Sequence, residues 1–335
     1  MLFNDNDLNH CQESIQKAQD LGNQRVHLVP TIYANLDKRR IKEYLYRDDH
    51  GKLQEFNADY LKSYHKKLLS CIEYAEELKM QIYLTPHIDD AAPNGKMRYF
   101  IDYSPLQPHG LFSFSQIMFE YLDQLKPEVQ KKIYLSLIGE TDLSIYHYSS
   151  DYHKLVTSLP SDLKLGLSFS LLQSQRGLPH FRKISFINQL DFLGVSAYNA
   201  IKYDCTPDSF EKIAGKFWKN MKKMGMKKPL RLHFTEIGLG GSLKGSFYTA
   251  LLPIMGQTGK YDASLDPWKI ETNYQYRKNY YKCLLGFLKK TPTIQAAFLW
   301  NSDSWDIQGL YPYSADYRDE MISNWIFEHN EKVRL

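Results

Sequence analysis

The chain has 335 residues, of which 43% are hydrophobic and 24% are charged, so it can bury a core as one large domain or two small ones. A formal net charge of +4 is too small to favour nucleic acid as a partner, and no apolar run approaches the length of a membrane span. Aromatic residues make up 14%, a surplus that suits either a core or a groove that stacks on sugar rings.

Helical and strand patterns alternate along the chain. The first helix is expected at residues 8–21, with Gly22 as the residue that ends it, and the second at 58–79, with Asn57 as its cap. The later helices are expected at residues 115–125, 151–158, 184–190, 208–224, 274–289 and 315–328. The apolar segments expected as strands are residues 25–31, 81–86, 132–140, 163–170, 191–199, 230–236 and 294–301.

These strands are continuously apolar rather than alternating, which is typical of strands that are covered on both faces. Seven strands, each followed by a helix and preceded by one more helix, predict a (β/α)8 TIM barrel that forms a single catalytic domain over residues 1–335. The first strand is then missing, or reduced to the few residues before Asn4, and a truncated start is favoured over a barrel of seven strands. A doubly wound open sheet is the alternative, but no glycine-rich dinucleotide or phosphate loop supports it.

Two glutamates stand where predicted strands end. Counting the absent strand as the first, Glu140 ends the fourth strand and Glu236 ends the seventh, so the two carboxylates are expected to face each other across the mouth of the barrel. Glycoside hydrolysis needs such a pair, because one carboxylic acid protonates the leaving oxygen while the other carboxylate attacks the anomeric carbon or activates water. A single glutamate at a strand end is more often solvated or paired in a salt bridge, so the pair carries the prediction.

Other side chains at the same mouth are candidates for substrate binding. His87 and Asp89 follow the third strand and are expected either to bind a sugar hydroxyl or to hold the loop behind them. Trp268 and Trp305 lie in or beside long loops, where each is as suited to packing the loop as to stacking on sugar. The remaining candidates are Tyr198 and Asn199 at the end of the sixth strand and Trp300 at the end of the eighth.

The segments "YLSLIGE", "DFLGVSAYN", "HFTEIGLG" and "AAFLWN" resemble strands four, six, seven and eight of the large clan of retaining (β/α)8 glycoside hydrolases. With "DPW" and "QYRKNYY" between the last two strands, the pattern is most similar to glycoside hydrolase family 113, the β-mannanase type. The resemblance implies Glu236 as nucleophile, Glu140 as general acid/base, Tyr198 as a partner of the nucleophile and Trp300 as a sugar platform. Much of the clan has Asn before the acid/base, whereas this chain has Gly139, so a contact to the sugar 2-hydroxyl must come from elsewhere.

The predicted function is therefore a retaining glycosidase that acts on a β-linked oligo- or polysaccharide, with β-mannan as the first candidate. No cofactor or metal is expected, and the predicted partner is a carbohydrate substrate, with no nucleic acid and no membrane, bound by a monomer. Two alternatives stay open: a catalytically silent carbohydrate-binding barrel, and a barrel hydrolase or lyase that uses only one carboxylate.

The four cysteines, Cys11, Cys71, Cys205 and Cys283, lie far apart and form no CxxC pair. This spacing predicts free buried thiols rather than a disulfide framework or a metal site. The polar start "MLFNDNDLNHC" has no pattern of a signal peptide. The location is thus unknown: cytoplasmic by default, or secreted if the N-terminus is truncated.

Overall fold

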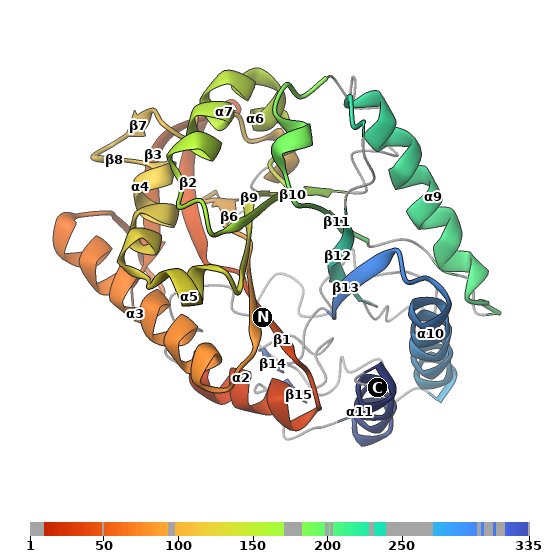
Figure 1. Cartoon of the computed structure of the whole chain (residues 1–335). Helices are drawn as coiled ribbons and strands as arrows, with labels where there is room; N and C mark the ends of the chain where they lie inside the picture. Colours follow the sequence, from red (N-terminus) through yellow and green to blue (C-terminus); the bar gives the residue numbers. More distant parts are fainter. Residues whose placement is uncertain are drawn as a thin grey trace.

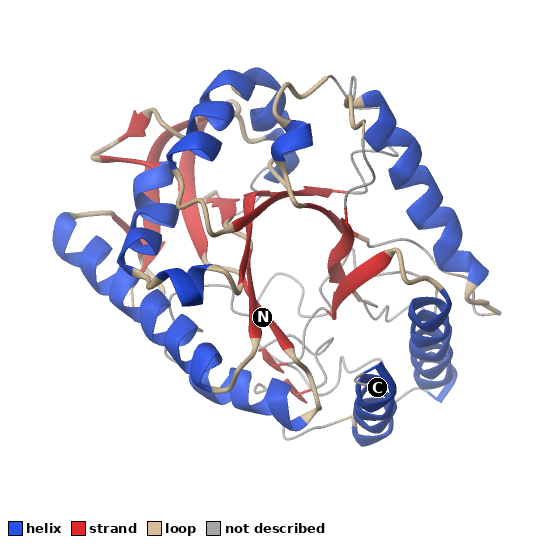
Figure 2. Ribbon diagram, viewed as in Figure 1, coloured by secondary structure: helices blue, strands red, loops and turns tan. Residues whose placement is uncertain are grey.

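The computed structural model describes residues 10–48, 50–92, 98–170, 183–197, 201, 204–227, 231–238, 271–299, 303–304, 311–312 and 319–333. For 272–273, 303–304, 311–312 and 333, only the backbone is described. Within these residues, seven parallel strands form a nearly closed ring with helices around its outside (Figures 1 and 2). In order around the sheet, the strands are β1 (Arg25–Leu28), β5 (Gln81–Leu84), β9 (Ile133–Gly139), β10 (Lys164–Ser170), β11 (Phe192–Ser196), β12 (Arg231–Ile237) and β13 (Ile294–Leu299). The predicted α/β TIM barrel is confirmed, one strand short of the full eight.

Helices cover the outer face of the barrel strands. They are α2 (Cys11–Asp20), α3 (Ala58–Glu77), α4 (Phe114–Phe119), α5 (Pro127–Gln130), α6 (Asp142–His147), α7 (Ser149–Ser158), α9 (Asp208–Lys223), α10 (Glu271–Lys290) and α11 (Glu320–Val333). Short 3-10 turns η1 (Arg98–Phe100), η2 (Glu120–Gln124) and η3 (Ile187–Gln189) lie between them. The side chain of Asn57 caps α3 by accepting a hydrogen bond from the Tyr60 amide, and Gly22 after α2 has a left-handed φ of 71°, as the sequence predicted.

Two of the barrel strands continue beyond the ring into a second sheet that the sequence did not predict. After Pro30 the chain forms β2 (Thr31–Asp37), and after Pro86 it forms β6 (His87–Asp90), which pairs with β2 in parallel. The antiparallel strands β3 (Arg40–Arg47) and β4 (Leu53–Glu55) complete this four-stranded sheet. The segments 25–31 and 81–86, each expected as a single strand, therefore end at bends between the two sheets. Two-residue pairs β7 (Pro108–His109) with β8 (Phe112–Ser113), and β14 (Asp303–Ser304) with β15 (Tyr311–Pro312), also form.

Among the described residues, the barrel is open between its two edge strands, β1 and β13, which do not pair with each other. A hollow of about 650 Å³ lies there, lined by both strands and by residues of α2 and α11. Side chains reach across it: the Arg25 guanidinium donates a hydrogen bond to the carbonyl of Gln295, and the rings of His27 and Phe298 lie 4.8 Å apart. The gap between β1 and β13 is thus the place that the expected first strand would occupy.

The prediction of free thiols is wrong. Cys11 forms a disulfide with Cys71, and Cys205 forms one with Cys283. The partners are 60 and 78 residues apart in sequence, but the fold brings them together: the first bond joins α2 to α3, and the second joins the segment before α9 to α10. Spacing along the chain could not reveal these contacts because helices around a barrel pack beside neighbours that strands and loops separate in the sequence.

Candidate active site

Glu140 directly follows β9 and has an unusual backbone conformation. Its φ is 61°, in the left-handed region that favours glycine, and its amide donates a 3.0 Å hydrogen bond to the carbonyl of Ser168 on β10. A non-glycine residue there costs on the order of 1–3 kcal/mol and persists where surrounding contacts fix it. Such residues cluster at functional sites, so the conformation of Glu140 makes the end of β9 the first place to look for chemistry.

Glu236 lies near the end of β12 and is only 2% exposed. Its residue pairs in register with Ser196 of β11, and its carbonyl accepts a hydrogen bond from the Ala197 amide. The carboxylate oxygen Oε1 lies 2.9 Å from Nε2 of His87, which is the first residue of β6 and is completely buried. The seventh-strand carboxylate is therefore held inside the barrel mouth, beside an imidazole that the third barrel strand delivers.

Arg98, at the start of η1, joins the other two predicted residues. Its Nε lies 2.6 Å from Oδ1 of Asp89, and its Nη1 lies 3.1 Å from Oε2 of Glu140. Arg98 was not predicted from the sequence, because it sits in an irregular stretch after the third strand with no motif around it. These contacts link Asp89, Arg98 and Glu140, while His87 and Glu236 form a second contact pair.

The surroundings of Glu140 favour the protonated form of its carboxyl group. Burial raises the pKa of Glu140, and the nearby charge of Glu236 raises it further, while the Arg98 guanidinium opposes the rise. Glu140 thus retains its proton to a higher pH than an ordinary carboxyl, and the influence of Glu236 indicates that the two side chains are close. Burial, with a smaller effect of Arg98, lowers the pKa of His87 to about 3, so its imidazole is neutral at ordinary pH.

Asp89 has the opposite balance. Burial alone would raise the pKa of its carboxyl, but the charge and hydrogen bond of Arg98 outweigh burial and lower the pKa. Asp89 is therefore ionised and forms a salt bridge with Arg98. The site consequently contains one carboxyl that tends to keep its proton, the ionised carboxylate of Asp89, the carboxyl group of Glu236, one cation and one neutral imidazole. Such groups can donate and accept protons.

The other predicted substrate-binding residues, Tyr198, Asn199, Trp268, Trp300 and Trp305, lie outside the residues that the structure describes. Their roles stay predictions, as does the binding of a sugar hydroxyl by His87 or Asp89. In the described part of the chain, no group of three or more His, Cys, Asp or Glu side chains is arranged to hold a metal ion. No described helix is both long enough and apolar enough to cross a membrane.

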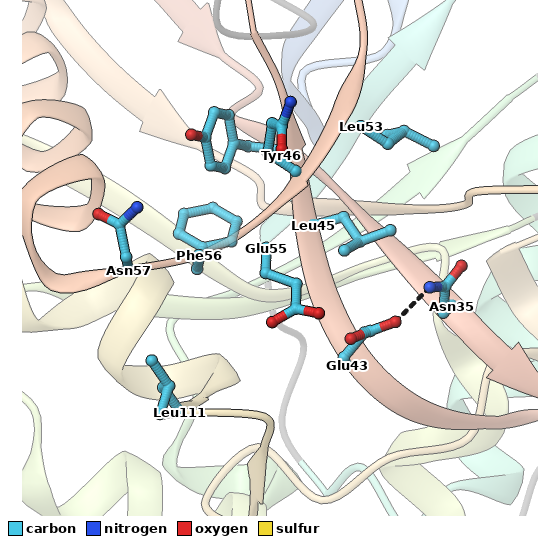
Figure 3. A pocket seen from close by; sticks show the side chains of 10 residues that line it. Asn35, Glu43, Leu45, Tyr46, Leu53, Glu55, Phe56, Asn57 and Leu111 are labelled. Atoms are coloured by element: carbon cyan, nitrogen blue, oxygen red, sulfur yellow. Dashed lines mark hydrogen bonds between the residues drawn. The ribbon is translucent and has the colours of Figure 1, made fainter.

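A hollow of about 620 Å³ lies apart from these residues, on the second sheet (Figure 3). Glu43, which is hydrogen-bonded to Asn35, and Glu55 approach it from β3 and β4, and Leu111 borders it from the β7–β8 turn. Its described lining includes none of the residues of the Glu140–Glu236 cluster. The hollow on the second sheet therefore does not belong to the site at the barrel mouth.

No known family model matches the sequence, and no curated protein matches it. The fold does match solved structures. A GH113 β-1,4-mannanase is 14% identical, with a TM-score of 0.57 over 96% of this chain and 93% of that one. The GH113 β-mannanase from Alicyclobacillus acidocaldarius in complex with ManMIm is 12% identical, with a TM-score of 0.57 over 99% of this chain and 96% of that one. At such low identity the likeness establishes the fold alone, a TIM barrel.

Proposed function

We propose that the chain is a retaining glycoside hydrolase of β-linked oligo- or polysaccharides, and that residues 1–335 form one catalytic domain. The observation that carries the proposal is the pair Glu140 and Glu236, which lie at the ends of two barrel strands and have different partners. The charge of Glu236 also raises the pKa of Glu140. The proposal assigns the nucleophilic carboxylate to Glu236, beside which the neutral imidazole of His87 lies 2.9 Å away. Burial and the charge of Glu236 favour the protonated form of Glu140.

In the first step, a carboxylate oxygen of Glu236 attacks the anomeric carbon, and Glu140 gives its proton to the leaving glycosidic oxygen. The bond from the anomeric carbon to the leaving oxygen breaks, and an ester between the sugar and Glu236 forms. The negative charge of Glu236 is then consumed, so the pKa of Glu140 falls, and the nearby Arg98 favours the ionised form. In the second step, Glu140 takes a proton from water, whose oxygen attacks the anomeric carbon and releases Glu236.

The choice of substrate rests on the fold and on aromatic residues. The solved structures with a similar fold include β-1,4-mannanases, and Trp300, Trp268 and Trp305 suit stacking on flat sugar rings. We therefore propose β-mannan as the first substrate to test, with a cello-oligosaccharide and aryl β-glycosides of several sugars beside it.

The test compares wild-type protein with Glu236→Gln, Glu140→Gln and the exposed control Glu128→Gln on this panel. We expect Glu236→Gln to lose turnover on every substrate. Glu140→Gln should lose roughly 10²–10⁴-fold on natural glycosides and less on aryl glycosides whose leaving group needs no proton. Glu128→Gln should retain full activity. Full activity of Glu236→Gln would contradict the proposal, and loss in only one of the two site variants would favour a one-carboxylate enzyme.

One observation favours a second candidate, a silent carbohydrate-binding barrel. The 3.1 Å contact between Arg98 and Glu140 stabilises the ionised form of a residue that must be protonated to act as an acid. Saccharide binding in calorimetry, without hydrolysis of any glycoside on the panel, would support this candidate over the hydrolase.

A further inference from the structure

The chain delivers His87 to the site through a bend that fixes its backbone. Pro86 ends the barrel part of the segment, and the His87 amide donates a 2.9 Å hydrogen bond to the carbonyl of Pro30, at the matching bend after β1. In the second sheet, His87 is in register with Thr31. Because both neighbouring bends occur at prolines, the imidazole projects from a backbone that has little freedom to move.

Gly139, the residue before Glu140, lies against the ring of His87. A Cβ atom built at Gly139 would stand 2.3 Å from Cδ2 of His87 and 2.3 Å from the carbonyl oxygen of Pro86. Neither contact is possible for a real side chain, and one of the two atoms belongs to the backbone, so the cost cannot be removed by a rotation of the imidazole alone. Any side chain at position 139 would therefore have to displace both the His87 ring and the Pro86 carbonyl. Position 139, where much of the similar glycoside hydrolase clan has asparagine, is thus a glycine beside an imidazole that fills the space of a side chain.

On its other side, the His87 ring lies against Glu236. The 2.9 Å distance from Nε2 to Oε1 is a close polar contact rather than an aligned hydrogen bond. Catalytic hydrogen bonds are often poorly aligned before substrate binds and tighten afterwards. No described residue accepts or donates a hydrogen bond at Nδ1, so among the described residues no other hydrogen bond competes with the contact to the carboxylate.

We propose that His87 is a positioning residue that holds the carboxylate of Glu236 for attack, and that Gly139 is present because the imidazole occupies the space of a side chain there. The inference rests on the proposed function of Glu236 as nucleophile. A neutral imidazole suits this role because it donates one N–H to the carboxylate and orients it, without adding a positive charge that would reduce its reactivity. Burial, which keeps His87 uncharged, supports the same assignment.

The experiment is a double-mutant cycle of His87→Ala and Gly139→Ala, with kcat, KM and the pH profile measured on the best substrate of the panel. Each single variant should lower kcat at least about 10-fold with little change in KM, because orientation of the nucleophile acts on the chemical step. The double variant should lose less than the product of the two single effects, since part of the effect of Gly139→Ala acts through the ring it displaces and the rest through the Pro86 carbonyl. The acidic limb of kcat/KM should move to higher pH in all three variants, as the Glu236 carboxylate loses its donor.

Two further variants separate positioning from packing. His87→Gln, whose amide nitrogen replaces Nε2, should recover much of kcat. Gly166→Ala is the matched control, because a Cβ there would stand 2.5 Å from the Phe192 ring instead of meeting His87. It should lower stability without moving the acidic limb.

Multiplying effects of the two alanine substitutions, or an unchanged acidic limb in His87→Ala, would overturn the role of His87 while leaving the two glutamates in place. Inactive wild-type protein, or full activity of Glu236→Gln, would instead overturn the proposed function and this inference together.

Discussion

Glu140 combines a backbone conformation that suits glycine with a carboxyl side chain, to which we assign the role of general acid/base. Glycine adopts φ near 61° without the steric cost of a Cβ atom, which is about 1–2 kcal/mol in the left-handed region. We therefore expect Glu140→Gly to have a higher free energy of unfolding than Glu140→Ala by about 1 kcal/mol, although both lose acid/base function. Chemical denaturation of the two variants measures the difference.

The control for this prediction is the same pair of substitutions at Glu73, an exposed residue within α3. In a helix the order of the two variants reverses, because glycine stabilises a helix less than alanine does, by up to about 1 kcal/mol. If Glu140→Gly were instead the less stable variant at its site, the left-handed conformation would not be a cost in the folded protein.

Arg98 sets how far the pKa of Glu140 can rise. The guanidinium, 3.1 Å from the carboxyl, opposes the effects of burial and of Glu236. Removing the charge in Arg98→Met should raise the pKa of Glu140 further. Because a general acid fails as the pH rises through its pKa, the basic limb of kcat/KM should then move to higher pH. Lys154→Met, which removes an exposed cation near Asp151, should leave that limb unchanged, and a downward shift in Arg98→Met would contradict these electrostatics.

For single residues, the sequence predicts the position of those that end a recognisable strand. Glu140 and Glu236 end apolar strands, and parallel strands end at the same mouth, so their convergence is predictable. The partners are not predictable in the same way. Arg98 reaches Glu140 from an irregular segment, and the match of Gly139 to His87 depends on two strands meeting at one depth in the barrel.

Among the elements, long periodic segments were predicted well and the second sheet was missed. The helix predicted at residues 208–224 forms as the amphipathic helix α9, which buries Phe210, Ile213, Ala214, Phe217 and Met221. The hairpin of β2 and β3 turns at Lys38, whose φ is 61°, so the glycine or asparagine that usually marks such a turn is absent. Without that signal, and with prolines at the bends, the strand pattern of residues 31–55 could not be distinguished from a loop.

The disulfide between Cys11 and Cys71 holds α2 against α3 on the outside of the barrel. It closes a loop with a sequence separation of 60, for which the chain-entropy estimate of stabilisation is roughly 4 kcal/mol. We expect the double variant Cys11→Ser/Cys71→Ser, with the Cys205–Cys283 bond intact, to unfold at a lower temperature than the wild type. The difference should disappear when both proteins are compared in a strong reductant after loss of both bonds. Equal melting temperatures under oxidising conditions would show that the bond does not form.

As a whole, the molecule is a barrel of continuous apolar strands whose interior also contains histidines. His27, His87 and His233 are buried, and His233 stacks on Phe192 with ring centroids 4.8 Å apart. Burial lowers the pKa of His87 and of His233 to about 3 and lowers that of His27 well below its usual range. The strand count was predictable from the sequence, but these buried imidazoles were not, because a histidine within an apolar run gives no sign of its protonation.

The three histidines predict how stability depends on pH. In the unfolded chain they take up protons as the pH falls below about 6.5, whereas the folded protein resists protonation down to about pH 3 at His87 and His233. Their contribution is therefore complete above pH 6.5 and is lost as the pH falls. The free energy of unfolding should decrease between pH 6.5 and 4, by up to about 1.4 kcal/mol per pH unit for each histidine. Denaturant titrations at a series of pH values measure this slope.

His233→Phe is the variant that tests the cause. Neither ring nitrogen of His233 has a hydrogen-bond partner among the described residues, and the ring packs among Tyr83, Tyr134 and Phe192. Phenylalanine should fit with little loss of stability at pH 7. Below pH 6.5 the unfolding reaction should take up one proton fewer, so the free energy of unfolding should depend less steeply on pH. An unchanged slope would mean that His233 is protonated in the folded protein as readily as in the unfolded chain.

The central claim is that Glu236 forms a covalent bond to the sugar while Glu140 handles the proton. The most direct measurement is mass spectrometry of the protein after reaction with 2-deoxy-2-fluoro-β-glycosyl fluorides of the manno and gluco configurations, whose fluorine slows the second step. We predict that one glycosyl unit is added, on the peptide that contains Glu236, and that Glu236→Gln is not labelled. Labelling of Glu140 or of any residue other than Glu236, or turnover with inversion and no labelled protein, would contradict this claim.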